Sequence, residues 1–416
     1  MTLSLARRAE QFPDRTAVVD ISEQRLYAPA ETIHEDRVSY DDLSTIATRT
    51  AERLAALDIG PGDTVCLVTR NRVAALALFF ACRRLGATFA PISHLLTPAS
   101  VERPFDVLEP DLVVSEAAQR DLVRSIPFDR TVTLEELADA DRADIDLDEQ
   151  HAAGENPLLA LHGGTGRPIA GYSAAAVERN CTTAVAAWGL AANDTVPLTA
   201  RLSAVDGLVR TALSVLHVGG TLLLDRAFDP GDALAAIEAE SATFLPSRAA
   251  ALRDLAAESG FDAAVDSLER VLCAAPVAED VVAAYRDRGI SVARVYGRLE
   301  CPIALSQAFE EEKAAMESDA DGTAIGTPVP DCRARLVDDA GAVLEGATEG
   351  RLQLSGPMVA DGYVPPTGTD GENWYDPAEL ESDEYDESDD HGRFVDGWFH
   401  TGDRFRRAED GTYVLL

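Results

Sequence analysis

The feature that most constrains the fold is an alternation of short apolar segments with amphipathic ones between residues 38 and 116. Residues 38–57 carry apolar side chains at helical spacing, and Ser39 before Asp42 provides the start of a capping box. The segment "GPGDTVCLVTRN" predicts a turn followed by a buried strand, and "FAPIS" and "LEPDLVVSE" predict two further strands. Between them, "VAALALFFACRRL", followed by Gly86, and "PASVERPFDVL" predict helices. Strands that alternate with helices predict a parallel sheet with crossover helices.

The same alternation returns between residues 218 and 297, where "VGGTLLLD", "ATFLPS", "LERVLCAA" and "VARVYG" predict strands. From about residue 323, short alternating runs interrupted by Gly and Pro predict a β-rich part. The predicted fold class is therefore α/β, with two α/β subdomains of parallel or mixed sheets and a smaller β-barrel-like subdomain. We expect these three units to span residues 1–160, 161–322 and 323–416.

The charge balance limits the partners that the chain can have. Asp and Glu outnumber Lys and Arg by 72 to 36, which gives a formal net charge of -36. Such acidity keeps a surface hydrated in concentrated salt and predicts adaptation to a high-salt cytoplasm, as in a halophilic organism. It argues against nucleic acids and anionic membranes as partners, because both require basic patches. Residues 370–390 hold 11 acidic residues and predict a solvated insert, with a cation or partner site as the alternative.

The remaining composition predicts a cytoplasmic location. No run of 18 apolar residues indicates a membrane span, and the N-terminus lacks the apolar region of a signal peptide. The six cysteines are scattered without a CxxC pair, which predicts buried free thiols and argues against a disulfide framework or a zinc site.

The segment "LHGGTGRPIAG" is the first that can carry chemistry. Gly163, Gly164 and Gly166 allow backbone N–H groups to converge on an anion, and the hydroxyl of Thr165 adds a donor. The lysine of a Walker loop does not follow. Taken alone, the segment predicts a bare turn as readily as a phosphate loop.

Two later segments add candidate side chains. "VYGRLECP" ends a predicted strand with Tyr296, Gly297 and then Glu300. An aromatic ring can stack on a base, a glycine lets a ligand approach, and a carboxylate can hold Mg²⁺, although a structural role is the alternative. "DGWFHTGDRF" places Asp403 after a glycine, in a predicted tight turn where a carboxylate can accept both hydroxyls of a ribose. Local hydrogen bonding within the turn is the alternative.

Together and in this order, the three segments resemble the adenylate-forming enzymes: acyl-CoA synthetases, luciferases and the adenylation domains of peptide synthetases. The resemblance runs from about residue 5 to 416 and includes "FPDRTAVVD", "FFACRRLGATFAPIS" and, most specifically, "GWFHTGD". It implies that a carboxylate attacks the α-phosphate of ATP and expels pyrophosphate, and that a thiol, usually that of CoA, captures the acyl-adenylate. The implied ligands are ATP or AMP, Mg²⁺, CoA and a small-molecule carboxylic acid.

The resemblance also implies residue roles. Tyr296 would stack on adenine, Asp403 would bind the ribose, and Thr165 would contact the phosphates. Glu300 would hold Mg²⁺, so Thr165 and Glu300 are the implied catalytic residues. The implied nucleotide-binding residues are Gly163, Gly164, Thr165, Gly166, Ala275, Pro276, Tyr296, Gly297 and Asp403.

The loop departs from the pattern TSGTTGxPKG that is usual in the family. Leu161, His162 and Gly164 replace hydroxyl residues, and Ile169 replaces the lysine. A charge-assisted hydrogen bond contributes about 1.5–3 kcal/mol, so these losses predict slower chemistry. Arg167 can replace part of the missing charge, although it occupies the variable position of the pattern.

Other departures concern a threonine, a histidine and a domain. Leu299 replaces the family's threonine before Glu300, and the family's usual histidine near the acyl tunnel is not evident in "PLTARLSAVDGL", residues 197–208. His217 is a poor substitute, and we expect it to be a helix histidine with satisfied hydrogen bonds. The family's mobile C-terminal domain, which brings a reactive lysine, is expected to be absent. Lys313 is the one lysine of the sequence, and it is predicted to lie on a solvated helix face.

Two functions of different classes therefore stay open. One is an AMP-forming carboxylate–CoA ligase, aided by a separate partner that carries the C-terminal domain. The other is a catalytically inactive relative that binds a nucleotide, an acyl ligand or a protein partner.

Overall fold

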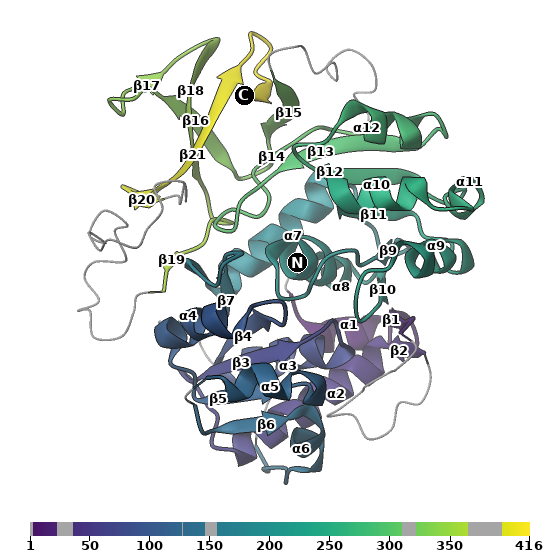
Figure 1. Ribbon diagram of the computed structural model, residues 1–416, viewed down its shortest axis with the longest axis vertical. Helices are drawn as coiled ribbons and strands as arrows, with labels where there is room; N and C mark the ends of the chain where they lie inside the picture. The colour runs from purple at the N-terminus through teal and green to yellow at the C-terminus, as the bar shows by residue number, and fades with distance from the viewer. Residues whose placement is uncertain (1–2, 23–35, 127, 146–155, 310–321, 365–392) are drawn as a thin grey trace.

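The computed structural model describes residues 3–22, 36–126, 128–145, 156–309, 322–364 and 393–416. The strands form three sheets, with helices between and around them (Figure 1). The acidic segment 370–390 and Lys313 lie outside the described residues, so the expectations for both stay predictions. In the part of the chain that is described, none of the helices has the length and apolar character needed to span a membrane.

A seven-stranded sheet has the strand order β19-β8-β7-β4-β3-β5-β6. The five strands from β7 to β6 run parallel to their neighbours, which confirms the sheet predicted from the alternation, whereas β8 and β19 join antiparallel. The strands are β3 (Thr64–Thr69), β4 (Thr88–Ser93), β5 (Leu112–Ser115), β6 (Thr131–Thr133), β7 (Leu159–His162), β8 (Ile169–Tyr172) and β19 (Gly362–Tyr363).

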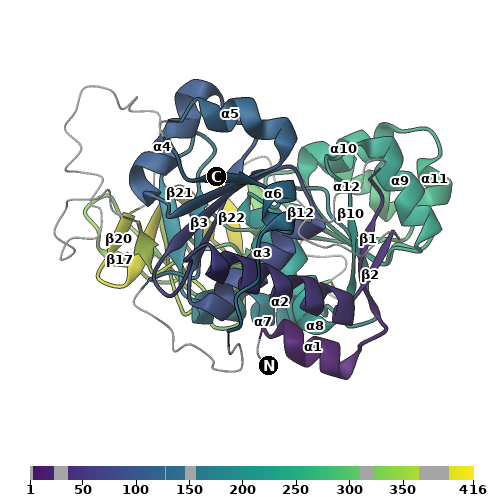
Figure 2. The ribbon, with the colours of Figure 1, turned by 90° about the horizontal axis from the view of Figure 1, so that it is seen from below.

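Helices cover both faces of this sheet because the side chains of its strands alternate. Val65 and Leu67 of β3 join the apolar core that contains α2 and α3, whereas Cys66 and Val68 pack with α4 and α5. Figure 2 shows these two pairs of helices on opposite sides of β3. The helices of this region are α2 (Tyr40–Ala56), α3 (Val73–Leu85), α4 (Pro98–Leu108), η1 (Ala117–Gln119), α5 (Arg120–Arg124) and α6 (Leu134–Asp139).

The predicted helix limits are confirmed. The Ser39 hydroxyl accepts from the backbone N–H of Asp42 at 3.0 Å, and the Asp42 carboxylate accepts from the backbone N–H of Ser39 at 3.1 Å, which completes the capping box of α2. Helix α3 ends at Gly86, whose φ of 72° is left-handed. Helix α4 spans Pro98–Leu108, the residues predicted from the sequence.

The second large sheet starts with three parallel strands and continues through antiparallel strands in the order β11-β12-β13-β14-β15-β22-β21-β18-β16-β17, with β20 on β21. The predicted α/β fold class with a β-rich part is confirmed, but the described strands of that part close no barrel, since the path from β11 to β17 is open. The strands are β11 (Phe244–Arg248), β12 (Arg270–Ala274), β13 (Ser291–Tyr296), β14 (Leu305–Ser306), β15 (Thr323–Pro328), β16 (Arg333–Val337), β17 (Val343–Leu344), β18 (Thr348–Ser355), β20 (Arg393–Val395), β21 (Trp398–Arg407) and β22 (Tyr413–Leu415). The helices beside the parallel strands are α9 (Pro230–Ala239), α10 (Ala249–Ala257), α11 (Phe261–Ala264) and α12 (Glu279–Arg286).

The smallest sheet has the order β2-β1-β10-β9 and combines strands from both sides of residue 160. The expected division of the chain at residues 160 and 322 stays a prediction. The strands are β1 (Thr16–Asp20), β2 (Arg37–Ser39), β9 (Thr195–Pro197) and β10 (Thr221–Leu224), with helices α1 (Leu5–Gln11), α7 (Ala174–Trp188), η2 (Asp206–Leu213) and α8 (Ser214–Val218) nearby.

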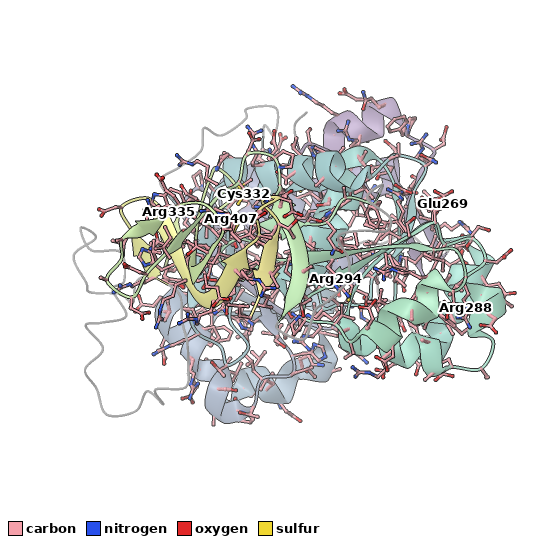
Figure 3. The ribbon with its side chains drawn as sticks, turned by 90° about the horizontal axis from the view of Figure 1, so that it is seen from above. Glu269, Arg288, Arg294, Cys332, Arg335 and Arg407 are labelled. Carbon is pink, nitrogen blue, oxygen red and sulfur yellow. The ribbon has the colours of Figure 1, made fainter. Side chains whose placement is uncertain are left out.

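A buried arginine lies on β13, where the parallel strands of this sheet meet the antiparallel ones. Figure 3 labels Arg294 on β13 and places Arg335 and Arg407 in the β-rich part. The Arg294 Nη2 lies 2.5 Å from a carboxylate oxygen of Glu279, and its backbone N–H donates to the Gln307 side chain at 2.9 Å. The bond to Glu279 compensates the buried guanidinium, and the backbone bond to Gln307 joins β13 to the segment after β14.

All six cysteines are free and buried, as predicted. Burial raises the pKa of the Cys66 and Cys82 thiols well above its usual range. These side chains therefore act as small apolar core residues.

Candidate functional site

The glycine-rich segment forms the loop of a β-hairpin. Strands β7 and β8 pair antiparallel, with His162 opposite Ile169. The backbone N–H of Gly163 donates to the carbonyl of Pro168 at 2.8 Å, and that of Gly166 donates to the carbonyl of Gly163 at 3.0 Å. The loop is thus closed at its base by backbone bonds.

Two of its three glycines are required by the shape of the loop. A Cβ on Gly163 would lie 2.5 Å from the carbonyl oxygen of Arg167. Gly166 has a φ of +95°, and a Cβ there would lie 2.9 Å from the carbonyl oxygen of Ser100. A Cβ on Gly164 would meet no atom within 4 Å, so Gly164 faces open space.

The loop presents few charged or hydroxyl groups. Thr165 is exposed, and its hydroxyl donates to the carbonyl of Arg167 at 3.4 Å. The Arg167 Nη2 lies 3.7 Å from the carboxylate of Asp106 on α4, so its charge is directed toward that helix. This pairing leaves the loop with backbone N–H groups and one hydroxyl as its donors.

His162 has a structural role that the sequence did not indicate. Its Nε2 accepts from the backbone N–H of Ser93 at 3.0 Å, and its Nδ1 lies 2.6 Å from the carbonyl of Gly163, so the ring is neutral with the proton on Nδ1. Burial lowers its pKa, and the positive charge of Arg201 adds to that. The ring joins the ends of β4 and β7 at the base of the loop.

Tyr296 and Asp403, far apart in the sequence, meet at the end of β13. The Tyr296 hydroxyl donates to the Asp403 carboxylate, and the Tyr296 ring lies edge-on to Phe405 with centroids 5.0 Å apart. The Nη1 of Arg298 lies 3.1 Å from the same carboxylate. Burial and the neighbouring Asp403 raise the pKa of Tyr296 well above its usual range, so Tyr296 stays a donor.

Asp403 lies within a strand, and its predicted placement in a tight turn is wrong. Strand β21 runs through it, and Gly402, with a φ of 79°, precedes it where the pairing register with β18 shifts. The backbone N–H of Asp403 donates to the Thr401 hydroxyl at 3.1 Å. A bulge at this glycine re-aims the carboxylate toward Tyr296.

Glu300 is buried and linked to the hairpin. The Tyr363 hydroxyl donates to its Oε1 at 2.6 Å, and its backbone carbonyl accepts from Ala360 at 2.7 Å. Tyr363 belongs to β19, which pairs with β8, and the Tyr172 hydroxyl of β8 donates to the carbonyl of Leu299. The hairpin and the glutamate are therefore neighbours.

A resident metal site is not built here. No group of three or more His, Cys, Asp or Glu side chains among the described residues can hold a metal ion. Mg²⁺ is often held by one or two carboxylates together with substrate phosphates. Glu300 fits that second arrangement, in which the ion arrives with the nucleotide.

The other predicted nucleotide residues lie at the same strand ends. The backbone N–H of Ala275 donates to Val295 at 2.9 Å, which extends the pairing of β12 and β13, and Pro276 is exposed. A Cβ on Gly297 would lie 2.0 Å from the carbonyl oxygen of Pro302. Packing against this backbone thus requires the glycine, whatever ligand approaches.

A buried ion-pair group at the ends of β3 and β5 was missed by the sequence reasoning. Arg72 Nη2 lies 2.6 Å from the Glu116 carboxylate, and Arg70 also pairs with it. Burial would raise the pKa of Glu116, but the hydrogen bonds and charges of the two arginines outweigh it and bring the pKa to about 2. The sequence signal that could have indicated this group is the presence of charged residues directly after two predicted strands.

A second missed group lies on η2, whose π-helical turns are frequent at functional sites. Asp206 Oδ1 lies 2.5 Å from Arg210 Nη1, and its other oxygen pairs with Arg248 of β11. Burial opposes ionisation of Asp206, yet the two arginines lower its pKa. These side chains line a cavity with Ala200 and Val295, on the face of the sheet toward η2.

His217 differs from its prediction. It is buried in α8, as expected for a helix histidine, but neither ring nitrogen has a hydrogen-bond partner among the described residues. Burial, together with the charge of Arg8, lowers its pKa to about 4. The prediction of satisfied hydrogen bonds is wrong, because the surrounding helices supply apolar and cationic neighbours.

Comparison with known proteins gives a family match and several relatives. A family model described as AMP-binding enzyme matches residues 5–364. The chain is 28% identical to a feruloyl-CoA synthase from Amycolatopsis sp over 390 residues, which cover 91% of this chain and 73% of that protein. It is 28% identical to an indoleacetate–CoA ligase from Aromatoleum aromaticum over 399 residues, which cover 91% and 72%.

Solved structures share the fold. The N-terminal domain of FACL13 from Mycobacterium tuberculosis superposes with a TM-score of 0.80 at 20% identity, over 99% of this chain and 98% of that one. The o-succinylbenzoate coenzyme A synthetase from Bacillus subtilis, in complex with AMP, superposes with a TM-score of 0.79 at 19% identity, over 99% and 97%. At these identities the likeness shows the fold alone.

Proposed function

Because this chain belongs to the AMP-binding enzyme family, we propose that it is an AMP-forming acid–CoA ligase. The observation that carries the proposal is the pairing of Tyr296 with Asp403 at the end of β13. A carboxylate beside an aromatic ring, at the carboxyl end of a parallel strand, suits a nucleoside. The curated relatives with similar chains are CoA ligases by name.

The proposed reaction has two steps. An oxygen of the substrate carboxylate attacks the α-phosphorus of ATP, and the bond to the leaving pyrophosphate breaks, which gives the acyl-adenylate. The sulfur of CoA then attacks the acyl carbon, and AMP leaves with the former carboxylate oxygen. The chain's own contribution is to position these groups and to neutralise charge.

On the nucleoside side, Asp403 would accept the ribose hydroxyls, and the Tyr296 ring would lie against adenine. Ala275 and Pro276 would border the base from the end of β12, next to Gly297. Arg298, whose Nη1 lies 3.1 Å from the Asp403 carboxylate, would hold that carboxylate in place for the ribose.

On the phosphate side, the loop would bind mainly through its backbone. Gly163, Gly164 and Gly166 would offer N–H groups, and Thr165 would turn its hydroxyl from Arg167 to a phosphate oxygen. When bound, Mg²⁺ would neutralise phosphate charge. Glu300, oriented by the Tyr363 hydroxyl, would hold that ion together with the nucleotide.

Pyrophosphate release tests the proposal. The full chain is assayed with ATP, Mg²⁺ and the acids ferulate, indoleacetate and o-succinylbenzoate, at about 0.1 M and about 2 M KCl. The expected result is acid-dependent release that an Asp403→Ala variant lacks. No release above the blank with each acid, with or without an added lysine-bearing C-terminal domain of a relative, contradicts the ligase.

A second function is favoured by the loop, whose single hydroxyl is directed at the Arg167 carbonyl. In this alternative, the chain binds a nucleotide without turnover. Calorimetric titration with AMP separates the two: AMP binding together with failed pyrophosphate release supports the alternative.

The proposal includes the setting in which the protein works. A net charge of -36 suits a high-salt cytoplasm, as in a halophilic organism, because salt screens the self-repulsion of the acidic residues. A separate polypeptide could supply the lysine that contacts the reacting groups in the family. The assay in about 2 M KCl, with and without that domain, tests both expectations.

A further inference from the structure

Arg201 lies where the ends of two sheets approach each other. The Asn71 side chain, just past the end of β3, holds both neighbours of Arg201: it donates to the Ala200 carbonyl at 3.2 Å and accepts from the Leu202 N–H at 2.8 Å. The Thr199 hydroxyl lies 2.8 Å from the Ser247 hydroxyl of β11. Arg201 is thus fixed between β3 and β11 at their carboxyl ends.

The backbone of Arg201 is also in close contact with η2. A Cβ on Gly207 would lie 2.1 Å from the carbonyl oxygen of Arg201, so only a glycine allows η2 to approach this closely. The Arg201 carbonyl also accepts a hydrogen bond from the Ala204 N–H at 3.0 Å. These backbone contacts fix the position from which the Arg201 side chain extends.

The Arg201 side chain itself is exposed, and no hydrogen bond or ion pair of its guanidinium is found within the described ranges. Its charged neighbour is another cation, Arg248, which, after burial, lowers the pKa of Arg201. Arg201 in turn helps to lower the pKa of His94 and His162. Because β3, β4 and β7 are parallel neighbours in one sheet, the end of β3 that anchors Arg201 lies at the same edge as the ends of β4 and β7.

The carboxylates of this region are already shared. Glu116 is held by Arg70 and Arg72, and Asp206 is held by Arg210 and Arg248. The five arginines of this group, Arg201 included, therefore exceed its two carboxylates. In a chain of net charge -36, such a local excess of positive charge attracts an anion.

The position relative to the loop indicates which anion. His162 directly precedes the loop, Gly164 faces open space, and Arg167 directs its charge to Asp106. The loop therefore offers backbone donors without a cation of its own. We propose that Arg201 supplies that cation and binds the phosphate of the nucleotide, an inference that rests on the proposed function. Arg201 thereby compensates for the hydroxyls and the lysine that the loop lacks.

Paired titrations with AMP and adenosine test this role, because the two ligands differ by the phosphate. In the full chain, Arg201→Gln is expected to weaken AMP binding by about 10- to 100-fold and to change adenosine binding by less than about twofold. Arg201→Lys is expected to lose less, because it keeps the charge but not the planar fork. Arg124→Gln on α5 is the matched control, since it removes an exposed arginine whose carboxylate partner is Asp121 of the same helix, and it should change neither affinity.

Each other outcome is informative. If Arg201→Gln weakens AMP and adenosine equally, or weakens neither, the role of Arg201 is overturned while the nucleotide site stands. If the unaltered chain binds neither ligand, the proposed function fails, and the role of Arg201 fails with it. An unchanged melting temperature of Arg201→Gln excludes misfolding as the cause, and the expected AMP loss shrinks at high KCl because the contact is between charges.

Discussion

The two sides of the candidate site differ in what they retain. At the end of β13, the tyrosine and aspartate side chains are present and paired with each other. At the hairpin loop, Gly163 and Gly166 retain the backbone path, but side-chain donors are few. The comparison shows that a loop can have the backbone shape of a phosphate loop with few side-chain donors. The shape depends on backbone contacts, whereas the binding of a phosphate also depends on side chains.

The loop side has other polar side chains nearby in place of the missing hydroxyls and lysine. His162 stands where the family's pattern has a hydroxyl residue, and its bonds to Ser93 and Gly163 join the strand ends at the loop base. Arg201 brings a guanidinium from another segment. The phosphate side therefore relies on residues outside the loop, whereas the nucleoside side relies on its own motifs.

The largest expected effect comes from removing the carboxylate of Asp403 on the nucleoside side. Asp403→Ala deletes the ribose acceptor together with its ion pair to Arg298, so AMP affinity should fall by about 100-fold or more. Calorimetric titration measures the loss. Asp339→Ala, which removes an exposed carboxylate of the same β-rich part, should leave AMP affinity unchanged. Equal affinities for Asp403→Ala and the unaltered chain would place the ribose elsewhere.

The sequence could predict the parts of this comparison that depend on local patterns. The parallel strands, the capping box at Ser39 and the stop at Gly86 follow from periodicity and backbone preference within a few residues. The order of the motifs predicted that the loop, Tyr296 and Asp403 belong to one site, and the structure brings the last two into contact.

The sequence could not predict contacts that depend on distant segments. Asp403 was expected in a turn, but pairing with β18 carries β21 through it as a strand with a bulge. Glu116 meets Arg70 and Arg72 from the segment after β3. Asp206 meets Arg210 of its own helix and Arg248 of β11, and only the folded chain shows that both carboxylates are then saturated. The freedom of Arg201 to meet an anion follows from that saturation.

A smaller effect is expected on stability at the loop base. His162→Leu leaves the buried Ser93 N–H without an acceptor, so the free energy of unfolding should fall by about 2 kcal/mol. Urea unfolding measures it. His400→Leu, which removes a half-buried histidine bonded to Gln353, is the matched control, and its loss should be about 1 kcal/mol or less. Equal losses would mean that His162 is an ordinary partner and holds no special place at the loop.

Adding a donor to the loop should sharpen the comparison from the other direction. Gly164→Ser places a hydroxyl where no atom lies within 4 Å, so it should raise AMP affinity by about 5- to 10-fold without loss of stability. The same titration measures the gain. Gly60→Ser, in a second open position, is the control and should have no effect. No gain from Gly164→Ser would show that the phosphate does not reach this face of the loop.

The smallest effect concerns the pH dependence of the His162 contribution. The pKa of His162 is lowered in the folded chain, so below the ordinary value of about 6.5 the unfolded chain binds a proton that the folded chain does not. The stability that His162 contributes is therefore complete above about pH 6.5 and is lost as the pH falls. Between pH 8 and pH 6 the expected loss is below about 1 kcal/mol.

The difference in unfolding free energy between the unaltered chain and His162→Leu isolates this loss. His94, His217 and His400 also have lowered pKa values, but they are present in both proteins, so their contributions cancel in the difference. The difference should shrink as the pH is lowered from 8 to 6. A constant difference would mean that the ring can take a proton without breaking its bond from the Ser93 N–H, which an Nε2 acceptor does not allow. The loop base would then not depend on a neutral histidine. The phosphate side would differ from the nucleoside side only in the hydroxyls and the lysine that its loop lacks.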